Sequence, residues 1–449
     1  MGTVLLYLVA LIPSSAMRDS ASGAAQIIYD EGTYPSVFGG TAGTLLDNWT
    51  DALMINTAFT RTGSPTADAL QATCVSFEGE KWVESLYHLF WGETEAEQGI
   101  STYSRYWHGY QVLLCPLLAL FSYPTIRSLN MLFETAAVLL LLYLLVRRGM
   151  DRLCLPFLVM WMCLSPATLF NSLQYSAVFY SMMGACIVLV WRHDELDAMS
   201  RSAVFTVCGV LVAYLDLLTY PLVALGVPLI LYLSMDSSRD LTLGRRAGQV
   251  LLYSAAWCIG YGGMWASKWV ITSLVTDEDV IATALSTAAF RASHSYDTQE
   301  YTLLGTVRLN AAHLASAVVV GSVLIAVVLF FVLRARCGTA RPNAAALVAI
   351  AVVCCYPFVW YAVLMNHSAI HHWMTYRELV IAVYGAVSML YVLLPGRAGP
   401  PAPGPPVGDG RPRGARGAHA SAPSEDGAGD APVEVPAGRH LRSPGARME

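Results

Sequence analysis

Long apolar runs separated by short polar stretches dominate this chain of 449 residues. A run of roughly 17 to 25 apolar residues can cross the hydrocarbon core of a bilayer, and it does so as a helix because backbone groups in lipid must satisfy one another. The sequence therefore predicts an all-α fold, a polytopic transmembrane bundle of about ten spans. The predicted spans are 3–17, 129–147, 153–171, 174–191, 203–219, 221–235, 249–274, 311–334, 344–365 and 373–394.

Basic residues gather in the short loops between these runs, which the positive-inside rule places in the cytoplasm. An even number of crossings must then separate consecutive basic loops, and the run 109–123 breaks this parity. That run is short and contains Pro116, so we predict a re-entrant or interfacial helix. The basic residues are Arg147, Arg148, Arg152, Arg192, Arg201, Arg239, Arg245, Arg246, Arg334, Arg336 and Arg341.

These assignments divide the chain into four parts. Residues 1–17 form the predicted first transmembrane helix, and 18–128 form a large extracytoplasmic loop that includes the interfacial or re-entrant helix. Residues 129–394 form the helical bundle. Residues 395–449 are rich in Pro, Gly, Ala and Arg and predict a disordered cytoplasmic tail. The prediction is a multi-pass protein of the cell membrane with both termini in the cytoplasm and residues 18–108 outside.

The composition of the chain indicates which classes of molecule it can bind. Hydrophobic residues make up 55% of the chain and charged residues 13%, whereas charged residues are about a quarter of soluble proteins. The membrane lipids are therefore predicted partners, and the net charge of -5 argues against nucleic acid. The ten cysteines show no CxxC spacing and no disulfide framework. The sequence indicates no oligomeric state.

Asp47 and Asp51 lie four residues apart, so on a helix they share one face. Such a pair can accept a proton from a hydroxyl nucleophile or hold a divalent cation, the one cofactor that the sequence leaves open. The alternative is structural, because Asp47 also fits the N-cap of a helix predicted from Asp47 to Phe59, with Asp51 in its first turn.

The motif Arg105-Tyr106-Trp107-His108 lies where the outer segment returns to the membrane. An aromatic belt with one anchoring arginine explains Arg105 and Trp107. His108 goes beyond what a belt requires, and a base or a hydrogen-bond donor to a phosphate is its functional interpretation.

Two ionisable residues lie near the outer ends of predicted spans. Asp216, followed by Tyr220, is costly there unless it is paired or hydrated. Lys268 lies between Trp265 and Trp269, where its ammonium can reach the headgroups or a lipid phosphate.

A histidine-rich turn precedes the last predicted span. His367 and His371 lie in this turn, and Tyr376 and Arg377 follow it. Clustered histidines can bind metal, but no acidic ligand lies beside them, so no metal site is assigned. A phosphate clamp of histidine with Arg377 suits these residue types better. Inside the last span, Arg377 requires a partner such as Glu378, Asp216 or a bound anion.

The chain resembles the GT-C class of polytopic membrane glycosyltransferases, which use polyprenyl-phosphate sugars at the outer face, and it is also similar to uncharacterised bacterial membrane proteins. The Asp-x-Asp or Glu-x-Asp pair typical of several GT-C members is absent from the early part of this loop. The resemblance implies helices parallel to the membrane in the first outer loop. It rests on the first helix, the long outer segment with Asp30-Glu31, Asp47 and Asp51, the motif Tyr106-Trp107-His108-Gly109-Tyr110, and Ile126-Arg127 before the second span.

The predicted function is transfer of a sugar from a polyprenyl-phosphate carrier to an envelope glycan or lipid acceptor. A transporter or flippase for a lipid-linked glycan is the alternative, and a non-catalytic partner in envelope assembly is another. The predicted catalytic residues are Asp47, Asp51 and His108, and the predicted substrate-binding residues are Arg105, Trp107, Asp216, Tyr220, Lys268, His367, His371, Tyr376 and Arg377.

Overall fold

The computed structural model describes residues 1–92 and 94–395. It is 71% helical with almost no sheet, which confirms the all-α class. The strands form two antiparallel pairs, β1 (Cys74–Phe77) with β2 (Gln98–Ser101) and β3 (Ser295–Tyr296) with β4 (Gln299–Glu300). No disulfide joins the cysteines of the described residues. The predicted disordered tail lies outside the described residues except for Pro395.

Among the described residues, five helical segments are long and apolar enough to cross a membrane, or six if a bent pair at the start of the chain counts as one span. Several apolar helices therefore support a membrane-embedded protein, whereas a count of about ten spans is not confirmed. The five are α7 (Tyr123–Arg147), α10 (Leu173–Trp191), α11 (Ala198–Leu215), α16 (Ala317–Cys337) and α17 (Ala344–Cys354) continued by α18 (Tyr356–Val363).

The continuous first span expected over residues 3–17 is replaced by two helices. α1 (Gly2–Ala10) and α2 (Ser14–Glu31) meet at 89°, because Pro13 removes a backbone donor and opposes continuation of the first helix. Gly2 lies beside the C-terminal end of α11, where its carbonyl accepts a 2.8 Å hydrogen bond from the Tyr214 hydroxyl. The cytoplasmic position of the N-terminus stays a prediction.

Two further runs are interrupted by local backbone chemistry. The run 153–171 divides into α8 (Cys154–Cys163) and α9 (Pro166–Asn171) at Ser165, whose φ is +60° and whose successor is proline. The run 373–394 begins as α20 (His372–Thr375) and a 3₁₀ turn, η2 (Tyr376–Leu379), before α21 (Val380–Tyr391).

Two predicted elements are short, separate helices. α12 (Val223–Met235) replaces the run 221–235 and is buried along its whole length of 13 residues. α6 (Gln111–Leu120) is the separate helix expected within 109–123, and its re-entrant or interfacial position stays a prediction. The remaining elements are α3 (Asn48–Phe59), α4 (Pro65–Gln71), α5 (Trp82–Trp91), η1 (Asp151–Leu153), α13 (Leu243–Val275), α14 (Val280–Arg291), α15 (Leu303–Ala312) and α19 (Met365–Ile370).

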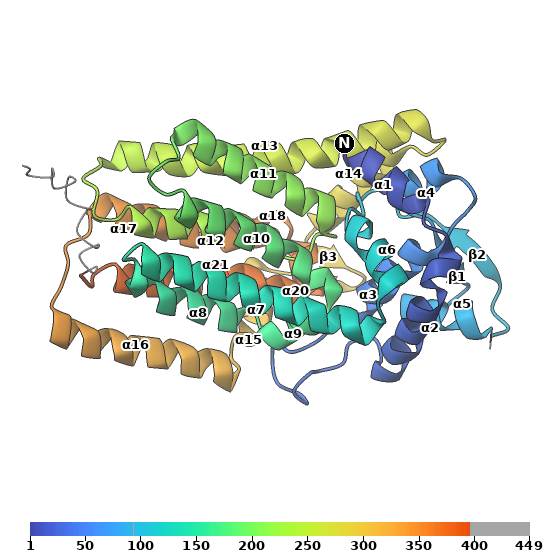
Figure 1. Ribbon diagram of the computed structural model, residues 1–449, viewed down its shortest axis with the longest axis horizontal. Coiled ribbons are helices and arrows are strands. Elements are labelled where there is room, and N and C mark those ends of the chain that lie inside the picture. Colours follow the sequence, from blue (N-terminus) through green and yellow to red (C-terminus); the bar gives the residue numbers. More distant parts are fainter. Residues whose placement is uncertain (93, 396–449) are drawn as a thin grey trace, which may run out of the picture. The chain divides into compact units, whose positions relative to one another are not determined.

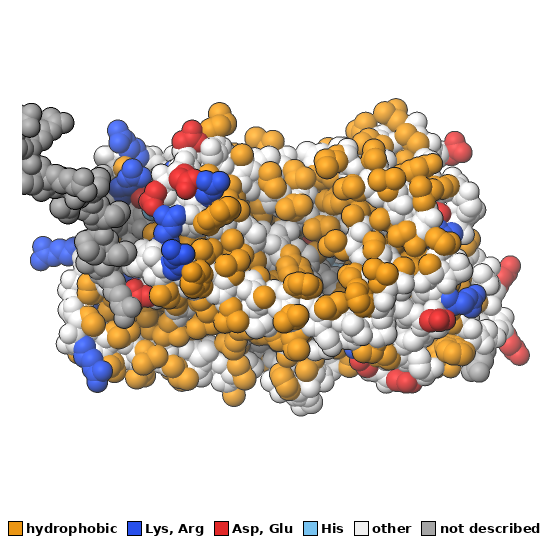
Figure 2. Space-filling view, viewed as in Figure 1, with side chains coloured by type: hydrophobic (Ala, Val, Ile, Leu, Met, Phe, Trp, Pro, Cys, Tyr) orange, Lys and Arg blue, Asp and Glu red, His pale blue; other side chains and the backbone are white. Residues whose placement is uncertain are grey.

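The long helices lie side by side, and the helices from α1 to α6 gather at one end of them (Figure 1). Figure 2 shows charged side chains concentrated at the two ends of this face, with a broad apolar surface between them. That distribution suits a bilayer, whose core excludes charge and whose boundaries accept it. The predicted outer segment therefore occupies one end of the bundle, where the candidate site lies.

The backbones of α11 and α13 touch at two glycines. A Cβ on Gly260 would lie 2.1 Å from the Thr206 carbonyl oxygen, and one on Gly209 would lie 2.3 Å from the Trp257 carbonyl oxygen. Small residues that let helix backbones meet are a common source of stability in membrane bundles. This contact positions the C-terminal part of α13, which carries Lys268.

We expect Gly260→Ala to lower the free energy of unfolding by about 1–3 kcal/mol, because the new methyl group must displace the backbone of α11. The control is Gly262→Ala in the same helix, where nothing lies within 4 Å of the new Cβ. Replacing that glycine should be neutral or stabilise by roughly 0.5–1 kcal/mol. Unfolding in detergent measures both, and equal effects would contradict the packing at Gly260.

Candidate functional site

Asp47 and Asp51 both have structural partners. Asp47 is the predicted N-cap of α3, and it accepts hydrogen bonds from the Thr50 amide at 3.2 Å and the Thr50 hydroxyl at 2.9 Å. Asp51 instead accepts the amides of Leu173 at 2.9 Å and Gln174 at 3.0 Å, the first N–H groups of α10. Burial raises the pKa of Asp47 to about 6 and that of Asp51 to about 7. Asp51 therefore joins the outer segment to the bundle.

His108 is held as one neutral tautomer. Its Nε2 lies 2.9 Å from the Tyr103 carbonyl oxygen, which can only accept, so Nδ1 accepts from the Tyr110 hydroxyl at 2.9 Å. The backbone has φ of +55°, an uncommon conformation for a residue with a side chain. Burial lowers the pKa of His108 to about 3, and the positive charge of Lys268 adds to the effect.

We expect the contribution of His108 to stability to fall as pH falls below about 6.5, the ordinary pKa of histidine. The unfolded chain then takes up a proton on His108 that the folded chain refuses until about pH 3. The loss should approach about 1.4 kcal/mol per pH unit. His108→Asn tolerates the same backbone and does not titrate, so unfolding of the two proteins between pH 7 and pH 5 isolates the histidine. Parallel curves would contradict the expectation.

Lys268 and Trp107 form a buried contact. The Lys268 ammonium donates to the Leu70 carbonyl and lies 5.4 Å from the centre of the Trp107 ring. Trp107 itself donates to the Met264 carbonyl at 2.6 Å. Arg105 lies over the ring of Tyr103 at 5.0 Å. Lys268 is fully buried, so protein groups surround its ammonium in this structure.

Arg377 is also fully buried, and none of the ion pairs among the described residues includes it. Its Nε donates to the Leu164 carbonyl at 3.2 Å, at the C-terminal end of α8, and its Nη2 donates to the Thr168 hydroxyl at 2.7 Å. The negative end of the α8 dipole thus takes the place of the expected carboxylate. The rings of Tyr175, Tyr376 and Tyr220 lie 3.9, 4.8 and 5.6 Å from its guanidinium.

The remaining candidates also bond within the protein. Asp216 follows α11 and accepts the Thr219 amide at 2.9 Å and the Thr219 hydroxyl at 2.6 Å. His367 donates to the Leu218 carbonyl at 3.0 Å and accepts from Arg291 at 3.3 Å, and its ring centre lies 4.9 Å from that of His371. Among the described residues, no group of three His, Cys, Asp or Glu side chains is placed to hold a metal ion.

The predicted site residues fall into three neighbouring groups instead of one open pocket. Arg291 connects the second group to the third, because its guanidinium lies 6.0 Å from the Tyr106 ring and bonds to His367. None of the predicted residues lines either of the two cavities described next. The groups are Asp47, Asp51, Tyr220, Tyr376 and Arg377 around Tyr175; Arg105, Trp107, His108 and Lys268; and Asp216, His367 and His371 around Leu218 and Thr219.

Two cavities flank Asp51. The apolar groove has a volume of about 660 Å³ and lies among α3, α6, α7, α10 and α11, and the polar cavity has a volume of about 350 Å³ and lies among α2, α7 and α9. Leu173, whose amide bonds to Asp51, lines the groove. Tyr123, whose hydroxyl is 3.5 Å from Asp51 Oδ2, lines the polar cavity. Tyr110, the partner of His108, also lines the groove.

No protein-family model, curated protein or solved structure matches this chain. A function is therefore inferred from the residues and cavities of this chain.

Sequence reasoning assigned no site role to several residues of this region. Arg127 binds Glu31 through both guanidinium nitrogens at 2.5 and 2.9 Å, between two helices that lie far apart in the sequence. Glu378 is fully buried and accepts the Leu222 amide at 3.2 Å, at the start of α12. Glu134 is fully buried within α7. A charged residue inside an apolar run is the signal that identifies the two buried glutamates.

Proposed function

We propose that the protein is a membrane glycosyltransferase that moves a sugar from a polyprenyl-phosphate carrier to an envelope glycan or lipid acceptor at the outer face. The observation that carries this proposal is the position of Asp51 between an apolar groove and a polar cavity. A lipid-linked sugar has these two chemistries, a long hydrocarbon chain and a hydroxyl-rich head. The groove suits the isoprenoid chain, and the polar cavity suits the head.

Asp51 would act as the general base. Its two bonds to the start of α10 fix the carboxylate, and burial raises its pKa to about 7, near the value that a base requires at neutral pH. The acceptor hydroxyl attacks the anomeric carbon and the carbon–oxygen bond to the carrier phosphate breaks. Polyprenyl phosphate leaves, and the hydroxyl proton passes to Asp51 through the hydroxyl of Tyr123, which lines the polar cavity and lies 3.5 Å from Asp51 Oδ2. Lys268 and Arg377 donate to the backbone carbonyls of Leu70 and Leu164, so in this proposal they stabilise the fold around the site.

The test compares Asp51→Asn with Asp47→Asn. Asparagine is a good N-cap, so Asp47→Asn should retain the start of α3 and most of the activity. Loss of a general base should lower sugar transfer by about 10²- to 10⁴-fold in Asp51→Asn. Incorporation of labelled sugar from a polyprenyl-phosphate donor in proteoliposomes, together with the glycan on the cell surface, measures the effect. Unchanged glycans at normal protein levels would refute the proposed base.

The groove has its own variant. Ala177 lies in α10 and lines the groove, so Ala177→Phe should obstruct the lipid chain and raise the concentration of donor needed for half-maximal transfer. Gly184→Phe introduces the same ring elsewhere in α10, where nothing lies within 4 Å of a new Cβ. Equal kinetics in the two variants would exclude the groove as the lipid site.

A further inference from the structure

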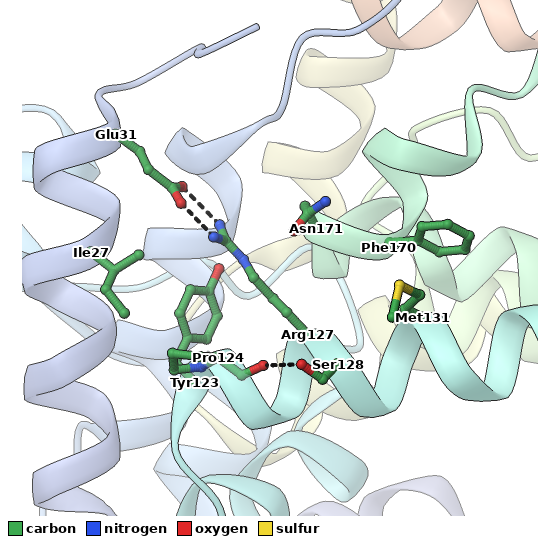
Figure 3. A pocket seen from close by; sticks show the side chains of 9 residues that line it. All are labelled: Ile27, Glu31, Tyr123, Pro124, Arg127, Ser128, Met131, Phe170 and Asn171. Carbon is green, nitrogen blue, oxygen red and sulfur yellow. Dashed lines mark hydrogen bonds and ion pairs between the residues drawn. The ribbon is translucent and has the colours of Figure 1, made fainter. Parts of the chain in front are cut away.

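The polar cavity is built from three elements that lie far apart in the sequence. Glu31 comes from α2, Tyr123, Arg127 and Ser128 come from α7, and Asn171 ends α9 (Figure 3). The Arg127 guanidinium lies 4.5 Å from the centre of the Tyr123 ring and extends to the Glu31 carboxylate. This ion pair is part of the cavity wall, with side-chain exposures of 11% for Arg127 and 30% for Glu31.

The charge of Arg127 is already compensated. Its two terminal nitrogens bind the two oxygens of Glu31 in a bidentate pair, the geometry in which a guanidinium binds a carboxylate most strongly. Asn48 fixes Glu31 from behind, because its amide nitrogen donates to Glu31 Oε2 at 3.0 Å. A phosphate or carboxylate ligand would have to displace Glu31 and then remain beside its negative charge, which disfavours anions.

The other polar groups of the wall present acceptors. Asn171 donates one of its two amide N–H groups to the Ala167 carbonyl at 2.8 Å, so its oxygen remains as an acceptor beside the second N–H. Ser128 uses its hydroxyl proton on the Pro124 carbonyl at 2.9 Å, which leaves its lone pairs. Glu31 has lone pairs beyond those bound to Arg127 and Asn48. A wall rich in acceptors requires a ligand that donates.

From this lining we infer that the polar cavity binds a neutral, hydroxyl-rich group and excludes anions. Hydroxyl groups donate to Asn171, Ser128 and Glu31, and Phe170 and Met131 supply apolar surface for the C–H face of a ring. The identification of this group as the sugar of the transferred substrate rests on the proposed function. The substrate is then a neutral sugar, as opposed to a uronic acid or a sugar phosphate.

The experiment ranks ligands on the full-length chain in lipid nanodiscs by ligand-observed NMR, with glucose, galactose, glucuronate and inorganic phosphate as probes. The neutral sugars should bind at least about tenfold more tightly than glucuronate, and phosphate should not compete with them. Equal or tighter binding of glucuronate or phosphate would overturn the inference, as would the absence of binding by any neutral sugar. This ranking on the unmodified chain decides the matter even where a variant fails to fold.

Two variants locate the binding. Glu31→Gln removes the carboxylate that pairs directly with Arg127, so the preference should reverse toward glucuronate and phosphate. Asn171→Leu should weaken the binding of neutral sugars by about three- to tenfold. The matched control is Asp194→Asn, which removes the carboxylate from an exposed pair with Arg148 and should leave the ranking unchanged. A ranking of ligands that is the same in Glu31→Gln places the sugar elsewhere and refutes the site.

The binding experiment and the transfer experiment can fail independently, because binding is measured without a lipid-linked donor. If the ligands rank as expected but Asp51→Asn leaves the glycans unchanged, the sugar-binding cavity is retained and the proposed base is rejected. If Asp51→Asn abolishes transfer but the ligands do not rank as expected, only the inference about the cavity is rejected.

Discussion

Asp51→Ala should lower the free energy of unfolding by about 2–5 kcal/mol, one of the two largest effects that we expect in this protein. The substitution leaves the amides of Leu173 and Gln174 without an acceptor at the buried start of α10. A buried donor without a partner loses its full hydration, which costs more than the net value of a hydrogen bond. Asp51→Asn keeps one acceptor and should cost less. Unfolding in detergent, followed by circular dichroism, measures both.

The control for this effect is another aspartate that caps a helix. Asp197 accepts the Ser200 amide at 2.8 Å at the start of α11, but it is exposed, so water can replace the carboxylate. Asp197→Ala should cost roughly 0.5–1 kcal/mol. If the two alanine variants were equally stable, Asp51 would not join α3 to α10 in the way the structure shows. Its role would then be limited to chemistry.

Local patterns predicted the elements whose causes are local. The helix that starts after Asp47 was readable, because the cap and the apolar run that follows lie within a few residues of one another. The separate helix at 111–120 was readable because Pro116 and Pro124 accompany a run too short to span a bilayer. Residues 3–17 were harder, since the apolar composition continues through Pro13 while the helix axis turns by 89°.

The candidate site depends on partners that no local pattern contains. Lys268 bonds to Leu70 and Asp51 bonds to Leu173 through backbone groups, and every residue has such groups, so the sequence does not distinguish the partner. The assignment of Asp216, Lys268 and Arg377 to substrate binding treated their charges as free for a ligand. In the folded chain, these side chains already bond to backbone carbonyls and amides or contact aromatic rings.

Arg377→Met should lower the free energy of unfolding by about 3–5 kcal/mol. The guanidinium bonds to the Leu164 carbonyl and the Thr168 hydroxyl, and it fills the space between tyrosine rings, the nearest of which is that of Tyr175 at 3.9 Å. Methionine is shorter and donates no hydrogen bond, so it leaves buried polar groups and a void. Arg377→Lys keeps the charge but not the planar fork and should recover only part of the loss.

Arg336→Met is the control, because Arg336 is exposed near the end of α16 and its replacement should change stability by less than about 0.5 kcal/mol. The same pair of variants separates the two roles of Arg377. A residue that holds α8 and η2 together loses stability and transfer in parallel when it is replaced. A residue that binds the carrier phosphate loses transfer while the unfolding curve stays in place. If Arg377→Met had normal stability but no transfer activity, Arg377 would bind the carrier phosphate. Its buried bonds to Leu164 and Thr168 would then have to break during turnover.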